Sequence, residues 1–223
     1  MRLSLPENRT DRISLIVSII IRISIVGAIL ISILVGKWTA LYTSSLTLIL
    51  TFLPSIIEKN YKISLPSEFE ILIIIFIYAS IFLGEVRGYY TRIWWWDIFL
   101  HTLSGLILGF VGFIILYVLS KNDLIQAQPL LLVIFSFSFA VAFGAIWEIF
   151  EFGMDSIFGL NMQKSGLVDT MSDLIVDTIG ALIISVAGYH YLKKVETPLF
   201  KKLIRRFSRE NPKYFREKQK NIE

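Results

Sequence analysis

The chain is dominated by long runs of apolar residues that are separated by short polar segments. A helix needs roughly 20 apolar residues to cross the hydrocarbon core of a bilayer, because it rises about 1.5 Å per residue. Strands of a membrane barrel would be about ten residues long, with apolar and polar residues in alternation. The runs are longer and more uniform than that. We therefore expect six membrane-spanning helices, at residues 13–35, 38–57, 68–86, 96–119, 128–152 and 170–192.

Composition supports this interpretation. Of the 223 residues, 55% are apolar and 18% are charged, and the mean hydropathy is +0.66. Soluble domains are nearer 45–50% apolar and about 25% charged. The chain has no cysteine, which excludes a disulfide scaffold and a thiolate metal site. Its two histidines, His101 and His190, are too few for a histidine cluster. The expected fold is an all-α polytopic integral membrane bundle of about six transmembrane helices.

The basic residues predict the orientation. Residues 193–223 hold 11 Lys or Arg against 4 Glu, a net charge of +7. Basic segments stay on the cytoplasmic side, and six spans place both ends on one side. We therefore expect a multi-pass protein of the plasma (inner) membrane with both termini cytoplasmic, divided into a six-span transmembrane domain, 1–192, and a basic tail, 193–223.

The tail also predicts a partner. In residues 199–209, apolar side chains recur on one face of a helix, and Lys and Arg fill the other. Such a helix lies on a membrane surface and attracts anionic lipids. The expected partners are the lipid bilayer and, at the basic tail, its anionic lipids. We expect no nucleic acid, because no motif for it is present, and the oligomeric state stays open.

Acidic residues gather on the last three spans, and none lies in the first two. A charged side chain at the centre of a span costs roughly 2.5–3.5 kcal/mol, so their presence there needs a reason. Each set follows helical spacing and lies on one stripe of its helix. Spans alternate in direction, so all the stripes reach one membrane face, the outer one in this orientation. With a nearby imidazole the set is Asp97, His101, Glu148, Glu151, Asp155, Asp169, Asp173 and Asp177.

Carboxylates with one imidazole are typical ligands of Mg²⁺ or Mn²⁺, and less typical ligands of Fe²⁺ or Zn²⁺. All eight residues are therefore candidate metal ligands, and there is room for two ions, which can activate water against a phosphoryl group. The candidate catalytic residues are Asp97, His101, Glu148, Glu151 and Asp173. The leading hypothesis is a metal-dependent membrane enzyme that acts on a lipid or isoprenoid phosphate at the outer face.

Two alternatives stay open. The same acids can serve a cation or proton-coupled transporter, or they can be paired within a structural membrane protein. Arg87, Arg92 and Lys164 lie on the same side and are candidate partners for such pairing. An acidic column that reached both membrane faces would favour transport, whereas these acids stop at one leaflet.

Two other features concern packing. Gly105 and Gly109 give the fourth span a face of small residues, which favours close contact with another helix. Arg22 lies inside the first span, where we expect it to snorkel to the interface or to pair with a buried acid.

Three motifs resemble those of a known family. The segment WDIFLHTLSG at residues 96–105 resembles the WDxxLHxxSG signature of the YjdF-type inner-membrane protein family of bacteria and archaea. WEIFEF at residues 147–152, followed by Asp155, resembles its WEIFEW…D segment, with Phe152 in place of Trp. Met162-Gln163, DTMSDL at residues 169–174 and Asp177 resemble its MQ…DTMxDLxxD segment. The resemblance, over residues 84–190, implies a polytopic membrane fold and marks the same acidic residues, and it implies no particular reaction.

Overall fold

The structure, a computed structural model, describes residues 9–215, and every regular element among them is helical. In chain order the elements are α1 (Arg9–Val35), α2 (Trp38–Leu50), α3 (Leu53–Tyr61), α4 (Ser67–Ile77), η1 (Tyr78–Val86), α5 (Tyr89–Arg92), α6 (Trp96–Lys121), α7 (Pro129–Phe158), α8 (Leu167–Leu192), α9 (Pro198–Glu210) and η2 (Pro212–Tyr214).

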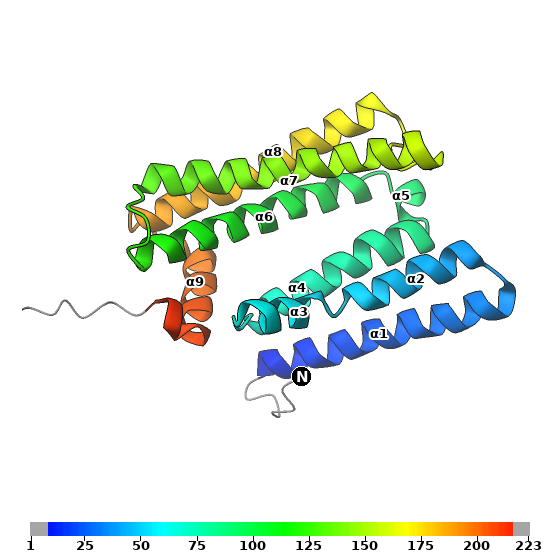
Figure 1. The fold of residues 1–223 in the computed structure, drawn as a ribbon, viewed down its shortest axis with the longest axis horizontal. Helices are drawn as coiled ribbons and strands as arrows, with labels where there is room; N and C mark the ends of the chain where they lie inside the picture. Colours follow the sequence, from blue (N-terminus) through cyan, green and yellow to red (C-terminus); the bar gives the residue numbers. More distant parts are fainter. Residues whose placement is uncertain (1–8, 216–223) are drawn as a thin grey trace, which may run out of the picture. The chain divides into compact units, whose positions relative to one another are not determined.

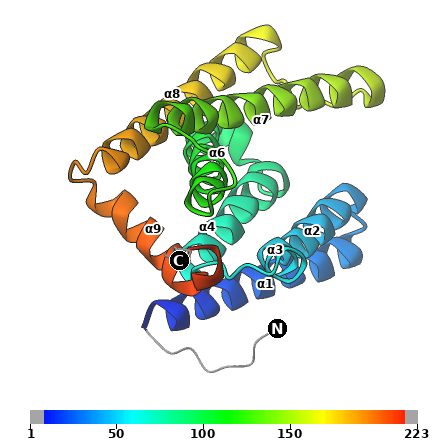
Figure 2. The same ribbon diagram turned by 60° about the vertical axis from the view of Figure 1, so that its left-hand side comes forward.

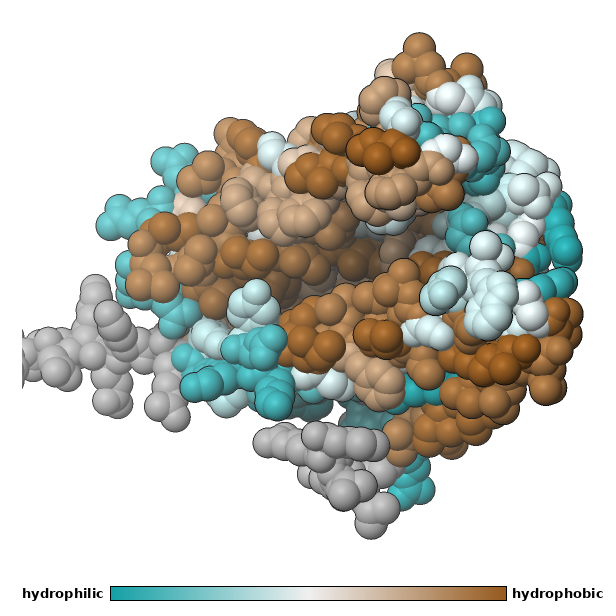
Figure 3. Space-filling model, turned by 45° about the vertical axis from the view of Figure 1, so that its right-hand side comes forward, coloured by the Kyte–Doolittle hydropathy of each residue, from teal (hydrophilic) through white to brown (hydrophobic). Residues whose placement is uncertain are grey.

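Six helical segments are long and apolar enough to cross a membrane, so the predicted fold class and the number of spans are confirmed. They are Arg9–Val35, Trp38–Tyr61, Ser67–Val86, Trp96–Lys121, Pro129–Phe158 and Leu167–Leu192. Many large apolar side chains point away from protein, such as Ile31, 62% exposed, and Ile149, 69% exposed. In Figure 3, hydrophobic residues dominate the middle of the visible surface, and hydrophilic residues lie mostly toward its left and right edges. Such a surface matches a bilayer.

The described residues divide into two compact units, which meet in the sequence between Trp96 and Asp97. In the first unit α1 packs against α2 and α4. Its core joins Ile21 and Ile25 of α1 to Ile74 of α4 and Phe82 of η1. The separation of the basic tail from a transmembrane domain 1–192 stays a prediction.

The second span of this unit is broken between α2 and α3, and Arg22 of α1 lies at the break. Its guanidinium donates hydrogen bonds to the carbonyl oxygen of Thr51, at 3.0 Å, and to the hydroxyl of the same residue, at 3.2 Å. The guanidinium carbon also lies 4.4 Å from the centre of the Phe52 ring. A broken helix leaves carbonyl groups without a partner, so the arginine binds backbone, where we expected it to snorkel to the interface or to pair with a buried acid.

The second unit consists of α6, α7 and α8, which run antiparallel to their neighbours in sequence, followed by α9 (Figures 1 and 2). Glycines let α6 and α8 approach closely. A Cβ atom on Gly105 would collide with the carbonyl oxygen of Asp177, and one on Gly180 with the carbonyl oxygen of Thr102. Gly109 faces Ile184 in the same way, so the predicted packing role of Gly105 and Gly109 is confirmed.

The tail helix α9 is amphipathic as predicted, but part of its apolar face contacts protein. Phe200 is 4% exposed and packs against Phe110 and Phe113 of α6, with ring centres 5.3 and 4.9 Å away. The sequence pattern identifies an apolar face, whereas the tertiary fold decides whether lipid or protein covers it. Leu199 remains 72% exposed, and Lys202 and Arg205 are exposed. The basic face of α9 is therefore not covered by protein.

Candidate metal centre

Three helix ends meet at one end of the second unit: the start of α6, the end of α7 and the start of α8. Their antiparallel order follows from two short connections. The loop between α7 and α8 runs from Gly159 to Gly166, and both glycines have a positive φ, a conformation that favours glycine. All eight residues expected at the site lie on these three helix ends.

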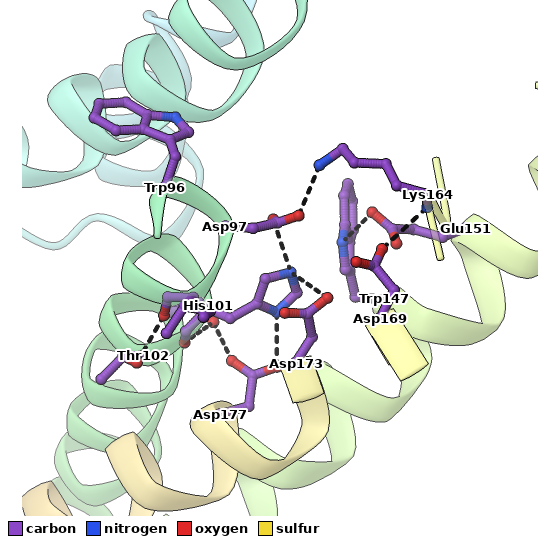
Figure 4. Close-up of polar contacts among 12 residues, drawn as sticks. Trp96, Asp97, His101, Thr102, Trp147, Glu151, Lys164, Asp169, Asp173 and Asp177 are labelled. Carbon is purple, nitrogen blue, oxygen red and sulfur yellow. Dashed lines mark hydrogen bonds and ion pairs between the residues drawn. The ribbon is translucent and has the colours of Figure 1, made fainter. Parts of the chain in front are cut away.

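His101 of α6 lies at the centre of the cluster, and Asp97, Asp173 and Asp177 turn toward its ring (Figure 4). Its Nδ1 atom is 3.2 Å from Oδ2 of Asp177. On the other side of the ring, Nε2 is 3.7 Å from Oδ1 of Asp97 and 3.9 Å from Oδ2 of Asp173. His101 and Asp173 are buried, at 9% and 3% exposed.

Asp177 of α8 is fixed from both sides. Its Oδ1 atom accepts a hydrogen bond of 2.5 Å from the hydroxyl of Ser104, while Oδ2 faces His101. Gly144 of α7 supplies the space, because a Cβ atom there would collide with Oδ2 of Asp177. Asp177 is 2% exposed and held in one position, so it orients the imidazole from the Nδ1 side of the ring.

Lys164, in the loop between α7 and α8, lies at the edge of the cluster, where the side chains are more exposed. Its Nζ atom is 2.8 Å from Oδ2 of Asp97, which leaves Oδ1 of the same carboxylate facing His101. Its backbone N–H donates to Oδ2 of Asp169 at 3.1 Å. The loop therefore brings one positive charge to the edge of an acidic cluster, as the sequence suggested for Lys164.

Asp155 serves the loop. Its two carboxylate oxygens accept hydrogen bonds from the backbone N–H groups of Met162, at 2.7 Å, and Gln163, at 2.8 Å. The Gln163 side chain in turn donates to the hydroxyl of Thr170 on α8. These bonds tie the end of α7 to the start of α8, and they engage both oxygens of Asp155 outside the His101 cluster.

Glu148 and Glu151 of α7 are buried, at 4% and 9% exposed. Oε1 of Glu151 accepts a hydrogen bond of 3.0 Å from the indole of Trp147. Neither carboxylate oxygen of Glu148 accepts a hydrogen bond of standard geometry within residues 9–215, although the Thr170 hydroxyl lies near enough to interact with it. Glu148 lies one helical turn after Gly144, on the side that faces Asp177, and it interacts electrostatically with His101 and Asp177. A buried carboxylate with so little hydrogen bonding is costly, so this oxygen pair is suited to a further partner.

The cluster therefore has an excess of carboxylates. Positive charge comes from Lys164 and, when protonated, from His101. Six carboxyl groups lie in the cluster or at its edge: Asp97, Glu148, Glu151, Asp169, Asp173 and Asp177. Asp97, His101 and Asp173 each offer a ligand atom within 4.8 Å of the other two. This is the geometry that a single cation can bridge.

The spacing in the sequence predicted that the eight residues lie at the same end of the three helices, and the structure shows that they have different contacts there. Asp97, His101, Asp173 and Asp177 converge, Glu148 and Glu151 are buried beside them, and Asp155 and Asp169 bind the loop. Ser104 was missed, although it lies three residues after His101 and so on the same helix face. Gly144 and Gly180 were also missed, because their importance depends on which helices touch.

Comparison with known proteins places the chain among membrane proteins. The family model described as "Predicted membrane protein (DUF2238)" matches residues 15–194. A Thermotoga maritima protein described as "Uncharacterized protein" is 27% identical over 143 residues, which is 64% of this chain and 72% of the relative. No solved structure matches the chain. The region that the family model matches contains the entire acidic cluster.

Proposed function

The chain belongs to the family of predicted membrane proteins (DUF2238), and we propose that it is a metal-dependent membrane enzyme whose cluster binds a divalent cation through Asp97, His101 and Asp173. The observation that carries this proposal is the direction of the His101 ring. Oδ2 of Asp177 lies 3.2 Å from Nδ1, so Nε2 points toward the carboxylates of Asp97 and Asp173, where a cation held between them would bind its lone pair. Metal-binding histidines are held in this way by a carboxylate on the opposite nitrogen.

The donor set favours Mg²⁺ or Mn²⁺, since two carboxylates and one imidazole provide mainly oxygen ligands. Fe²⁺ and Zn²⁺ are compatible with the same residues. The ligand atoms of Asp97, His101 and Asp173 already lie within 4.8 Å of one another, so small side-chain movements suffice to close the site. Lys164 binds the other oxygen of Asp97 and does not need to leave.

Glu148 and Glu151 are the proposed general bases, or the ligands of a second ion. Both are buried on α7 beside the cluster, and the Glu148 oxygens accept no hydrogen bond of standard geometry in the described part of the chain. A carboxylate in that state is available to accept a proton from water or to bind a cation.

A phosphate-bearing lipid, such as an isoprenoid phosphate, is the proposed substrate. The cluster lies toward one end of three apolar spans, the part of a spanning helix nearest to the lipid headgroups. A cation there would attract a phosphoryl group, and Lys164 at the edge supplies a second positive charge. Trp147, 45% exposed next to Glu151, gives an aromatic surface at the same level.

We further propose the plasma (inner) membrane as the location, with both termini cytoplasmic and the cluster on the outer side. The excess of Lys and Arg in residues 193–223 supports this orientation. The basic face of α9 supports binding to anionic lipids. The three motifs around the cluster support a narrower placement among YjdF-type proteins.

The test combines metal content with activity. The purified wild-type protein should retain Mg²⁺ or Mn²⁺ after gel filtration, and it should release phosphate from isoprenoid diphosphates or phosphatidic acid in micelles until a chelator is added. Asp173→Asn should lose both properties. Asp123→Asn is the matched control, because it removes the same charge at the opposite end of α6 and suits the positive φ of Asp123.

A protein that binds metal but releases no phosphate would favour the transport alternative. One observation favours that alternative. An unbroken chain of polar contacts leads from the loop between α7 and α8 into the helix bundle, through Lys164, Asp97, His101, Asp177 and Ser104. Cation uptake into proteoliposomes, again with Asp173→Asn and Asp123→Asn, separates the two functions. If neither uptake nor phosphate release depends on Asp173, both functions are excluded.

A further inference from the structure

A cavity of about 540 Å³ lies at the end of the second unit that is remote from the acidic cluster. The last turns of α6 and α8, the first turn of α7, the segment after α8 and the start of α9 line it. His101 and Asp173 lie several turns before the residues of α6 and α8 that line the cavity, so roughly 25–30 Å separates the cavity from the cluster. We call it the tail-side cavity.

Three lysines from three different elements line the tail-side cavity: Lys121 from the end of α6, Lys194 from the segment after α8, and Lys201 from α9. Within residues 9–215 none of them forms an ion pair. Glu196 is the acidic residue in the lining, so the cavity carries a positive excess. Like charges that are brought together by a fold repel one another, and a bound anion relieves that repulsion.

The remaining walls suit the lipid that carries such an anion. Tyr117 and Tyr191 line the cavity with their ring centres 6.1 Å apart, and the buried Leu132 adds an aliphatic surface. Tyrosine is enriched where a membrane protein meets lipid headgroups. Pro129 at the first turn of α7 also lines the cavity, so the positive end of that helix dipole points toward it.

We propose that the tail-side cavity binds the phosphate headgroup of an anionic membrane lipid. The lysines of α6, of the segment after α8 and of α9 hold the phosphate, while Tyr117, Tyr191 and Leu132 contact the glycerol and the upper acyl chains. A volume of about 540 Å³ lies within the range of small-molecule sites. This site differs from general attraction of lipid to the basic face of α9, because it requires particular lysines from separate elements.

The test measures lipid binding to the purified full-length protein in uncharged detergent. Dioctanoyl phosphatidylglycerol should bind saturably, as bound copies in native mass spectrometry, and should raise the melting temperature. Dioctanoyl phosphatidylcholine and inorganic phosphate should do neither at equal concentration. Each basic residue near a membrane surface strengthens anion binding roughly fivefold, so the triple variant K121Q/K194Q/K201Q should bind phosphatidylglycerol roughly a hundredfold more weakly.

The matched control is K59Q/K193Q/K213Q, which removes three charges that lie neither in the cavity wall nor on the basic face of α9. It should bind phosphatidylglycerol within about twofold of wild type, since it leaves the three lysines in place. Equal loss in both variants would show general charge attraction and overturn the proposal. Equal binding of inorganic phosphate would also overturn it in favour of a free-phosphate site. A lipid-free melting temperature for each variant shows whether it is folded.

Discussion

The two nitrogens of the His101 ring have different surroundings, and this difference gives the imidazole a direction. Nδ1 faces Asp177, which is also held by Ser104, while Nε2 faces Asp97 and Asp173. A carboxylate beside Nδ1 favours a proton on that nitrogen, so Nε2 of the neutral ring can bind a cation held by the other two carboxylates. Asp177 is therefore a positioning residue for a site formed by its neighbours.

Replacement of Asp177 tests this role. Asp177→Ala removes the acceptor for Nδ1, so the ring is free to turn, and we expect affinity for Mn²⁺ to fall about 10–100-fold. Asp177→Asn keeps an acceptor oxygen of nearly the same shape and should lose less. Isothermal titration calorimetry measures both. Equal affinity in Asp177→Ala and wild type would contradict a positioning role.

Asp173→Asn separates the metal hypothesis from structural pairing. The cluster holds more carboxylates than positive groups, so removal of one charge should relieve repulsion in metal-free protein. We expect a gain on the order of 1 kcal/mol, or roughly 2–4 °C in melting temperature for a chain of this size. The rise in melting temperature that metal gives the wild type should disappear, because that rise comes from binding to the folded state.

The opposite result has a clear meaning. If Asp173 mainly pairs with His101, its replacement leaves a buried charge without a partner and destabilises the protein. An equal loss of stability with and without metal would therefore reject the metal site. Asp123→Asn, measured in parallel, reports the effect of the same charge change away from the cluster.

At the scale of helices, the site depends on how closely α6, α7 and α8 approach. Aspartate and serine have short side chains, so Ser104 can reach Asp177 only where the two backbones nearly touch. Gly105 and Gly180 allow that approach between α6 and α8, and Gly144 makes room on α7. Small residues at a helix interface thus set the geometry of the polar residues one turn away.

Gly105→Ala should disturb both stability and the site. The added methyl group would overlap the Asp177 carbonyl oxygen, and we expect a cost of about 1–3 kcal/mol together with weaker metal binding. Gly153→Ala is the matched control, because its Cβ atom would meet no other atom within 4 Å. It should stabilise α7 by up to about 1 kcal/mol. Denaturation in mixed micelles measures both, and similar values for the two variants would refute the packing role.

The sequence predicted the elements well because hydrophobic length decides which segments span a bilayer. It also predicted which acids share one end, since antiparallel spans alternate. It could not divide the acids by role. Asp155 binds the loop because α7 continues to Phe158 and the chain then turns back at Gly159, a geometry that no periodicity encodes. Phe200 looked lipid-facing because its protein partners, Phe110 and Phe113, lie far earlier in the sequence, on α6.

At the scale of the whole molecule, the two ends of the second unit carry opposite charge. Acids gather where α6 and α8 begin, and lysines gather where these helices end. Basic residues remain on the cytoplasmic side during insertion, whereas carboxylates are less decisive. The charge difference therefore predicts that residues 159–166 face outward and that α9 faces the cytoplasm.

The absence of cysteine makes this orientation directly measurable by single substitutions. Ser165→Cys introduces a thiol in the exposed loop beside Lys164, and Lys213→Cys introduces one in the exposed segment after α9. In intact cells a membrane-impermeant maleimide should label Cys at 165 but reach Cys at 213 only after permeabilisation. Ser185→Cys, 1% exposed within the unit, should stay unlabelled in both conditions and controls for unfolded protein. Reversed labelling would overturn the orientation and leave the cluster intact, because the three helix ends share one side in either direction.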